Sequence, residues 1–170
     1  YRNLIVPKNT MFVTISQSGE TADTLAAFRK AKDSKNYIGF LAICNVANST
    51  LVRESDLSLM TMAGPEIGVA STKAFTTQLV VLQLLTLSLS LARSSNRSLE
   101  TKWVTDLKRL PRLAEKILSL DFKIKEMAES FADKNHALFL GRGEHYPIAM
   151  EGALKLKEIS YIHAEDYPSG

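Results

Sequence analysis

Three hydroxyl side chains and a glycine fall together at residues 16–21, which read Ser-Gln-Ser-Gly-Glu-Thr. An apolar run precedes this segment and a helical pattern follows it. Its backbone is therefore expected at a helix N-terminus, where unpaired N–H groups and a partial positive charge attract anions. Hydroxyls without a neighbouring lysine suit a single phosphate monoester, and Gly19 would let the backbone approach it closely. The same residues could instead form an ordinary helix cap, with Ser18 or Thr21 as the capping side chain.

A second group of possible catalytic side chains lies near the end of the chain. Glu151, Lys155 and Glu158 are spaced at i, i+4 and i+7, so they share one stripe of a helix. A carboxylate and an amine on one face can move protons, and Lys155 would keep Glu158 ionised, as a general base requires. Salt-bridged residues with this spacing are also common on the solvent-facing side of ordinary helices.

The elements that would position these residues alternate between strands and helices. The predicted strands cover residues 11–15, 38–44, 57–62 and 136–140, and the predicted helices cover residues 24–32, 66–93, 99–119, 122–132 and 146–161. Pro111 is expected to kink or break the third of these helices. This order predicts an α/β fold with a mainly parallel sheet, in which ligands bind at the carboxyl ends of strands. Residues 16–21 and 141–143 both occupy such ends.

Composition narrows the class of protein. The formal net charge of +3 is small and basic residues are mixed with acidic ones, which argues against a nucleic-acid partner. Cys44 is the single cysteine, in an apolar run typical of a buried strand, so a reducing compartment fits. The histidines have no ligand-like spacing, so no metal site is expected. The uncharged stretch 74–92 is too polar for a typical membrane span, and a helix buried inside the domain is expected instead.

Longer motifs resemble a known family. Residues 16–21 look like the signature turn of SIS domains, and the segments that resemble the isomerase part of the glucosamine-6-phosphate synthase family are 45–56, 66–75, 140–143 and 151–165. The resemblance covers nearly the whole chain. It implies a flavodoxin-like three-layer sandwich around a parallel sheet. Residues 1–118 would be a first SIS subdomain with its trailing helices, and residues 119–170 the start of a second, both truncated.

The family converts fructose 6-phosphate and glutamine to glucosamine 6-phosphate and glutamate. The resemblance assigns substrate-binding roles to Ser16, Gln17, Ser18 and Thr21 at the phosphate, and to Val69 and Ser71 near the sugar. Glu158 matches the base that moves a proton between C1 and C2, and Lys155 matches a lysine that assists ring opening and imine chemistry. One base over adjacent carbons, with the phosphate as a remote handle, is what an aldose–ketose conversion needs. No cofactor is expected.

The resemblance also places parts of the reaction outside these 170 residues. The family's glutaminase domain and an upstream substrate-gripping loop would precede Tyr1, and its ring-opening histidine and tail lysine would follow Gly170. The chain alone is therefore expected to be inactive, as a fragment of a cytoplasmic enzyme that is a homodimer at full length, with no membrane partner. Two alternatives are a stand-alone aldose–ketose isomerase and a sugar-phosphate-sensing module of a transcription regulator. A sensor needs no base, so Glu158 with Lys155 favours an enzyme.

Overall fold

The computed structural model describes residues 5–94 and 96–170. Residues 1–4 of the predicted first subdomain, and Ser95 in a loop predicted at 94–98, lie outside the described residues. The chain forms two compact units, and each is described by itself: a first unit of Tyr1–Ile67 and Ser71–Ser95, and a second unit of Gly68–Ala70 and Asn96–Gly170. The predicted subdomain boundary at 118/119 falls at the end of a helix within the second unit and stays a prediction.

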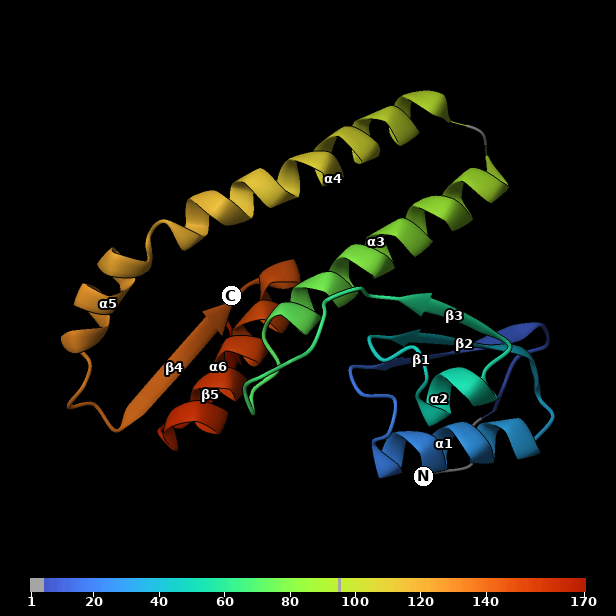
Figure 1. The fold of residues 1–170 in the computed structure, drawn as a ribbon, viewed down its shortest axis with the longest axis horizontal. Helices are drawn as coiled ribbons and strands as arrows, with labels where there is room; N and C mark the ends of the chain where they lie inside the picture. Colours follow the sequence, from blue (N-terminus) through green and yellow to red (C-terminus); the bar gives the residue numbers. More distant parts are fainter. Residues whose placement is uncertain (1–4, 95) are drawn as a thin grey trace. The chain divides into compact units, whose positions relative to one another are not determined.

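The first unit is built on a parallel three-stranded sheet in the order β1-β2-β3 (Figure 1). Its elements are β1 (Thr10–Ser16), α1 (Ala22–Asp33), β2 (Tyr37–Cys44), α2 (Thr50–Glu54), β3 (Leu57–Met60) and α3 (Lys73–Arg93). Ser16 pairs with Cys44, and Cys44 pairs with Met60, so the three strands end level with one another. The segments that follow β1 and β2 therefore both begin at the carboxyl end of the sheet.

Aromatic packing between the sheet and α1 forms the core of the first unit. Phe28 of α1 is fully buried, and its ring centroid lies 5.2 Å from that of Phe40 on β2 and 6.4 Å from that of Phe12 on β1. Leu51 of α2 belongs to the same cluster, so α1 and α2 cover the same face of the sheet (Figure 1). Full burial of a side chain such as Phe28 contributes about 1.5–3 kcal/mol to stability. The contacts of Phe28 with Phe12 and Phe40 also hold α1 in position on the sheet.

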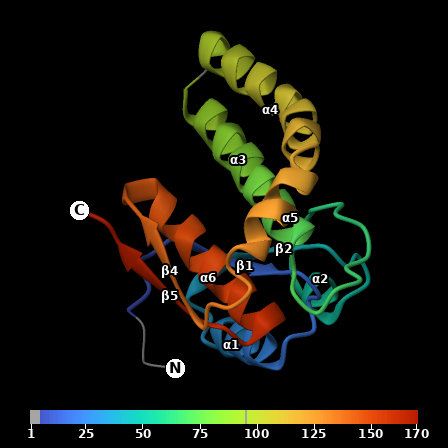
Figure 2. The same cartoon turned by 90° about the vertical axis from the view of Figure 1, so that its left-hand side faces the viewer.

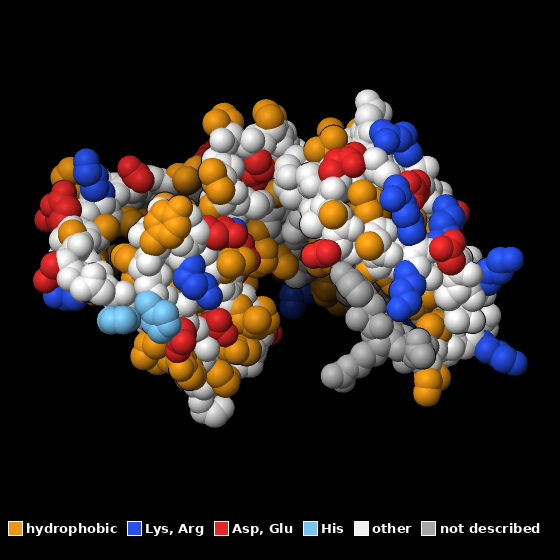
Figure 3. Space-filling view, turned by 90° about the horizontal axis from the view of Figure 1, so that it is seen from below, with side chains coloured by type: hydrophobic (Ala, Val, Ile, Leu, Met, Phe, Trp, Pro, Cys, Tyr) orange, Lys and Arg blue, Asp and Glu red, His pale blue; other side chains and the backbone are white. Residues whose placement is uncertain are grey.

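The second unit combines long helices with a two-stranded parallel sheet. Its elements are α4 (Arg97–Leu118), α5 (Asp121–Glu129), β4 (His136–Gly141), the 3₁₀ helix η1 (Gly143–His145), α6 (Tyr146–Ser160) and β5 (His163–Pro168). α6 connects the two parallel strands and lies against both of them (Figure 2). Ala153 of α6 and Ala164 of β5 are buried at this contact, whereas Leu138 and Leu140 of β4 are exposed. Hydrophobic side chains also lie among charged ones on the surface (Figure 3).

The predicted α/β class with parallel sheets is confirmed, and the four predicted strands form. Three short elements were not predicted: α2, the 3₁₀ helix η1 and β5. The segment before α2 is rich in Asn and Ser, and α2 has only five residues, so it shows no apolar periodicity. β5 reads His-Ala-Glu-Asp-Tyr-Pro, whose polar residues give no strand signal. Its backbone nevertheless pairs with β4 over the whole strand, from His136 with His163 to Gly141 with Pro168.

The structure corrects two helix predictions, the start of the helix over 66–93 and the break at Pro111. The helix predicted over 66–93 begins only at Lys73, because the Glu66 carboxylate accepts a hydrogen bond from the backbone N–H of Ala74 and caps the helix from outside it. Of the kink or break predicted at Pro111, a break does not occur, because α4 is continuous through that residue, and the kink stays a prediction. The side chains of residues 108–118 are all exposed, so the backbone carbonyl that loses its partner at Pro111 can be hydrated.

The expectation that α3 is buried inside the domain is also wrong for this chain. Within the described residues, only Ala74, Val81 and Leu87 of α3 are buried. An 18-residue stretch of α3 has a mean hydropathy of 1.6, and 17% of it is buried. Length and composition would therefore allow α3 to cross a membrane, but core helices of soluble domains share both properties.

Candidate functional site

The turn between β1 and α1 is closed by hydrogen bonds within residues 16–21. Ser16 Oγ accepts a hydrogen bond from the Gly19 N–H at 2.9 Å, and Ser18 Oγ accepts one from the Glu20 N–H at 3.2 Å. Gly19 has φ +67°, in the left-handed region that favours glycine. The turn therefore curls back on itself, and the Ser16 and Ser18 hydroxyls each accept one hydrogen bond within it and keep a proton to donate.

Three hydrogen bonds from the segment after β2 hold this turn from outside. The backbone N–H of Asn45 donates to Gln17 O at 3.2 Å, and that of Leu51 donates to Gly19 O at 3.1 Å. The backbone N–H of Thr50 donates to the Glu20 carboxylate at 2.7 Å. The turn is thus shaped by hydrogen bonds from the residue after β2 and from the first turn of α2.

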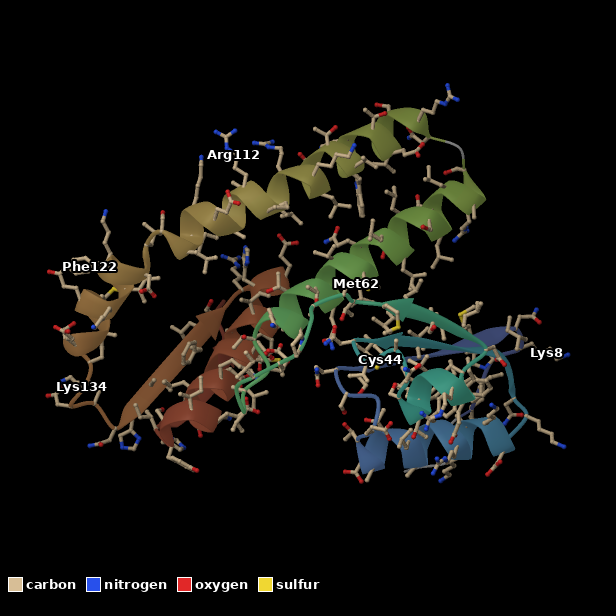
Figure 4. All side chains as sticks on the ribbon, in the orientation of Figure 1. Lys8, Cys44, Met62, Arg112, Phe122 and Lys134 are labelled. Atoms are coloured by element: carbon tan, nitrogen blue, oxygen red, sulfur yellow. The ribbon has the colours of Figure 1, made fainter. Side chains whose placement is uncertain are left out.

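Cys44 lies under the turn at the end of β2 (Figure 4). Its side chain is free and fully buried, with Sγ 3.6 Å from Gln17 O and 3.5 Å from Ser49 Oγ. These contacts confirm the prediction of a packed core thiol. Its position makes Cys44 a support for the turn.

The N-terminus of α1 comes directly after the turn at residues 16–21. Thr21 is the N-cap residue, but its side chain makes no capping hydrogen bond and is exposed, while Ser18 is half-buried. The ordinary cap considered from the sequence is therefore absent from this described helix end. An anion here could accept hydrogen bonds from the Ser18 and Thr21 hydroxyls and from the backbone N–H groups of the first turn of α1.

One carboxylate lies within the turn, that of Glu20. The hydrogen bonds from the Thr50 backbone and side chain lower the pKa of Glu20, and the nearby charges of Arg53 and Arg29 lower it further. Glu20 is therefore ionised at neutral pH, and its charge is directed toward α2.

Val69 and Ser71, the residues expected near the sugar, differ in their surroundings. Val69 is fully exposed. Ser71 is half-buried, and its hydroxyl lies 3.5 Å from the Glu66 carboxylate that caps α3. Ser71 is thus held in place by the start of α3.

Asn45 was not predicted, yet it organises the segment after β3. Its Oδ1 accepts hydrogen bonds from the Thr61 hydroxyl at 3.0 Å and the Ala63 N–H at 2.9 Å, and its Nδ2 donates to Gly64 O at 2.7 Å. Asn45 also donates its backbone N–H to Gln17 O. One residue therefore connects the turn after β1 with the segment after β3.

The predicted stripe on the last helix is confirmed as a contact. On α6, Lys155 Nζ lies 2.6 Å from Glu158 Oε2 and 3.6 Å from Glu151 Oε1. The hydrogen bond to Glu158, followed by the charge of Glu151, raises the pKa of Lys155, although partial burial acts in the opposite direction. Lys155 is therefore an ammonium at neutral pH beside Glu158. This group lies in the second unit, whereas Ser16, Gln17, Ser18, Thr21 and Ser71 lie in the first.

A further set of polar contacts on β5 was not predicted. The Tyr146 hydroxyl donates to Asp166 at 2.8 Å and ties the start of α6 to β5. On the other face of the strand, Glu165 contacts His163 Nε2 at 3.3 Å. Among the residues that the structure describes, no group of three or more His, Cys, Asp or Glu side chains is arranged to hold a metal ion.

Comparison with known proteins defines the class. The model of the SIS domain family matches residues 3–88 and 130–170, so the chain belongs to the SIS domain family. Within this family, the chain is 63% identical over 171 residues to the glutamine–fructose-6-phosphate aminotransferase (isomerizing) of Pseudomonas putida. It is 61% identical over 170 residues to that of Escherichia coli K12. Both matches cover 100% of this chain and 28% of the relative, so the chain spans little more than a quarter of their length.

A solved structure gives the same result for the fold. The C-terminal domain of glucosamine-fructose-6-phosphate aminotransferase from Francisella tularensis matches with a TM-score of 0.94 and 57% sequence identity. The match covers 99% of this chain and 47% of that chain.

Proposed function

We propose that the chain is the part of a glutamine–fructose-6-phosphate aminotransferase that binds and isomerises the sugar phosphate. The observation that carries the proposal is the identity of 61–63% over the whole chain to aminotransferases of this name. This similarity favours the aminotransferase over a stand-alone isomerase or a sensing module of a transcription regulator.

In this proposal the turn after β1 binds the phosphate group. The Ser16, Ser18 and Thr21 hydroxyls and the Gln17 side chain are the donors. Val69 and Ser71 lie near the sugar. The closed shape of the turn supports this role, because donors that are held in place before binding lose less entropy when the ligand arrives.

Glu158 and Lys155 carry the chemistry in this proposal. Glu158 removes a proton from one of the two adjacent carbons, C1 or C2, and returns it to the other, so the proton is conserved. Lys155 assists ring opening and imine formation as a proton donor. Their 2.6 Å contact supports the assignment, because it holds the carboxylate and the ammonium side by side on one face of α6.

The longer protein would supply the remaining functions. We propose that it contains a glutaminase domain in the same chain, forms a homodimer and works in the cytoplasm without a cofactor or a metal. The single buried, free Cys44 is compatible with a reducing compartment. Light scattering on the full-length protein would test the dimer, and a monomeric mass at working concentration would contradict it.

A thermal-shift titration with fructose 6-phosphate, glucosamine 6-phosphate and unphosphorylated fructose tests the binding function. A ligand that binds the native chain raises its melting temperature by mass action. We expect both phosphosugars to raise it and fructose to have no effect. Equal shifts with all three sugars would contradict a site that recognises the phosphate.

A further inference from the structure

We propose that Glu20 is a positioning residue that fixes the phosphate-binding turn by linking it to the N-terminus of α2. The inference rests on the proposed function, because it concerns the alignment of the turn that would hold the phosphate. It explains why a negatively charged side chain stands in a turn that would bind a phosphate dianion, although like charges repel.

The first argument is the direction of the Glu20 side chain. Its Oε1 accepts a hydrogen bond from the Thr50 backbone N–H at 2.7 Å, across 30 positions of sequence. Ser49, the N-cap residue of α2, makes no side-chain capping bond of its own. Glu20 therefore caps α2 from a different segment, and a carboxylate is favourable there because helix N-termini carry partial positive charge.

The second argument is what the Glu20 backbone holds. Its N–H donates to Ser18 Oγ at 3.2 Å, so one lone pair of this hydroxyl oxygen is engaged within the turn. A hydroxyl whose oxygen accepts from the protein has its proton left to donate to a ligand. Glu20 is thus anchored by its side chain to α2 and orients the Ser18 hydroxyl through its main chain.

The third argument concerns charge. Arg53 and Arg29 lie near Glu20, and both act on its carboxylate. These positive charges offset part of the negative charge of Glu20, although Arg29 also pairs with Glu54. The role that remains for Glu20 is the hydrogen bond to Thr50, which an uncharged acceptor could also make.

These arguments predict opposite results for two variants that remove the same charge. Glu20→Ala loses both the charge and the acceptor, whereas Glu20→Gln loses the charge and keeps an oxygen that can accept from Thr50. If repulsion of the phosphate were the main effect of Glu20, both variants would bind phosphosugar more tightly. If Glu20 positions the turn, Glu20→Ala alone binds more weakly.

Calorimetric titration of the chain with fructose 6-phosphate and with inorganic phosphate distinguishes these cases. We expect Glu20→Ala to weaken binding about fivefold, from the usual cost of losing a helix cap, and Glu20→Gln to bind at least as tightly as the wild type. Glu54→Ala is the matched control, because Glu54 also lies beside Arg29 but its carboxylate pairs with that arginine and not with the turn. Equal affinities for Glu20→Ala and the wild type, or equal changes in both Glu20 variants, would overturn the inference.

Amide hydrogen exchange gives a readout that does not depend on ligand. The Thr50 N–H should exchange slowly in the wild type and in Glu20→Gln, and faster in Glu20→Ala. Unchanged Thr50 exchange in Glu20→Ala would also overturn the inference. Failure of the wild-type chain to bind any phosphosugar, with the Thr50 exchange pattern as expected, would count against the proposed function while leaving the Glu20–Thr50 link supported.

Discussion

A Cβ atom placed on Gly19 would lie 2.6 Å from Cβ of Ser49 and 2.9 Å from Sγ of Cys44. Both neighbours are fully or almost fully buried, so neither can move away easily. The glycine is therefore required for space as well as for its positive φ of +67°.

Gly19→Ala should therefore destabilise the chain more than its backbone angle alone would. The left-handed conformation costs about 1–2 kcal/mol for a residue with a side chain. The clash with the Ser49 and Cys44 side chains should add about 1–3 kcal/mol. Gly64→Ala is the control, because Gly64 also has a positive φ of +71° but a Cβ there would meet nothing within 4 Å. Equal unfolding free energies for the two variants in urea titrations would show that the space beside Gly19 is unimportant.

Removal of the Ser18 and Thr21 hydroxyls should weaken phosphosugar binding. The double variant Ser18→Ala, Thr21→Ala loses two donors, and a hydrogen bond to a charged group is worth about 1.5–3 kcal/mol. We expect a loss of affinity of about tenfold or more for fructose 6-phosphate, measured by calorimetric titration. Thr76→Ala on the exposed side of α3 serves as a control for a lost hydroxyl. Unchanged binding in the double variant would place the phosphate elsewhere.

The contact between α6 and β4 depends on a second glycine. A Cβ on Gly152 would lie 2.8 Å from two ring carbons of Phe139. Gly152→Ala should thus be destabilising, even though alanine is favoured over glycine within a helix by about 1 kcal/mol. Phe139→Leu combined with Gly152→Ala should recover part of the loss in thermal unfolding, because the smaller side chain makes room. Stabilisation by the single variant would refute this explanation.

The start of α3 depends on Glu66. Glu66→Ala removes the acceptor for the Ala74 N–H and should cost about 1 kcal/mol in unfolding free energy, as for other helix caps. Glu66→Gln keeps an acceptor oxygen and should lose less. Circular dichroism during urea titration would measure both. An equal loss in the two variants would indicate that the charge of Glu66, and not its hydrogen bond, supports α3.

The ion pairs on α6 should make stability depend on pH in the alkaline range. The pKa of Lys155 is raised in the folded chain, so its contribution is fully present below its ordinary value of 10.5 and is lost as the pH rises through the folded value. The difference in stability between the wild type and Lys155→Met should therefore be constant from pH 7 to 9 and shrink above about 10.5. Lys157→Met, on an exposed position of the same helix, provides the comparison. A difference that is independent of pH up to the alkaline limit would contradict the role of the pairs.

The sequence patterns predicted the elements that carry apolar residues with a clear period, such as β2 and the helix that follows β1. They failed where polar residues form structure through distant partners. β5 is a strand because its backbone pairs with β4, not because of its side chains. The start of α3 at Lys73 was also missed, because the Glu66 side chain reaches the Ala74 N–H from outside the helix.

The residues of the candidate site also fall into those that the sequence pattern predicted and those that it did not. The hydroxyl pattern at residues 16–21 and the i, i+4, i+7 spacing of the last helix were visible in the sequence. The contributions of Asn45 and Glu20 were not, because each contacts a segment that lies far away along the chain. The roles of Ser18, Thr21 and Glu158 toward a substrate stay predictions.

The register of the two sheets has a consequence for how the chain folds. Thr14 pairs with Ala42 and His136 pairs with His163, so paired strands in both units are separated by roughly 30 residues or fewer. The two strands of each strand–helix–strand segment can thus pair before residues farther along the sequence have folded. Parallel sheets usually fold slowly because they join remote segments, and low contact order relieves this delay. Residues 136–168 are therefore expected to form protected backbone amides together, as one cooperative step during refolding.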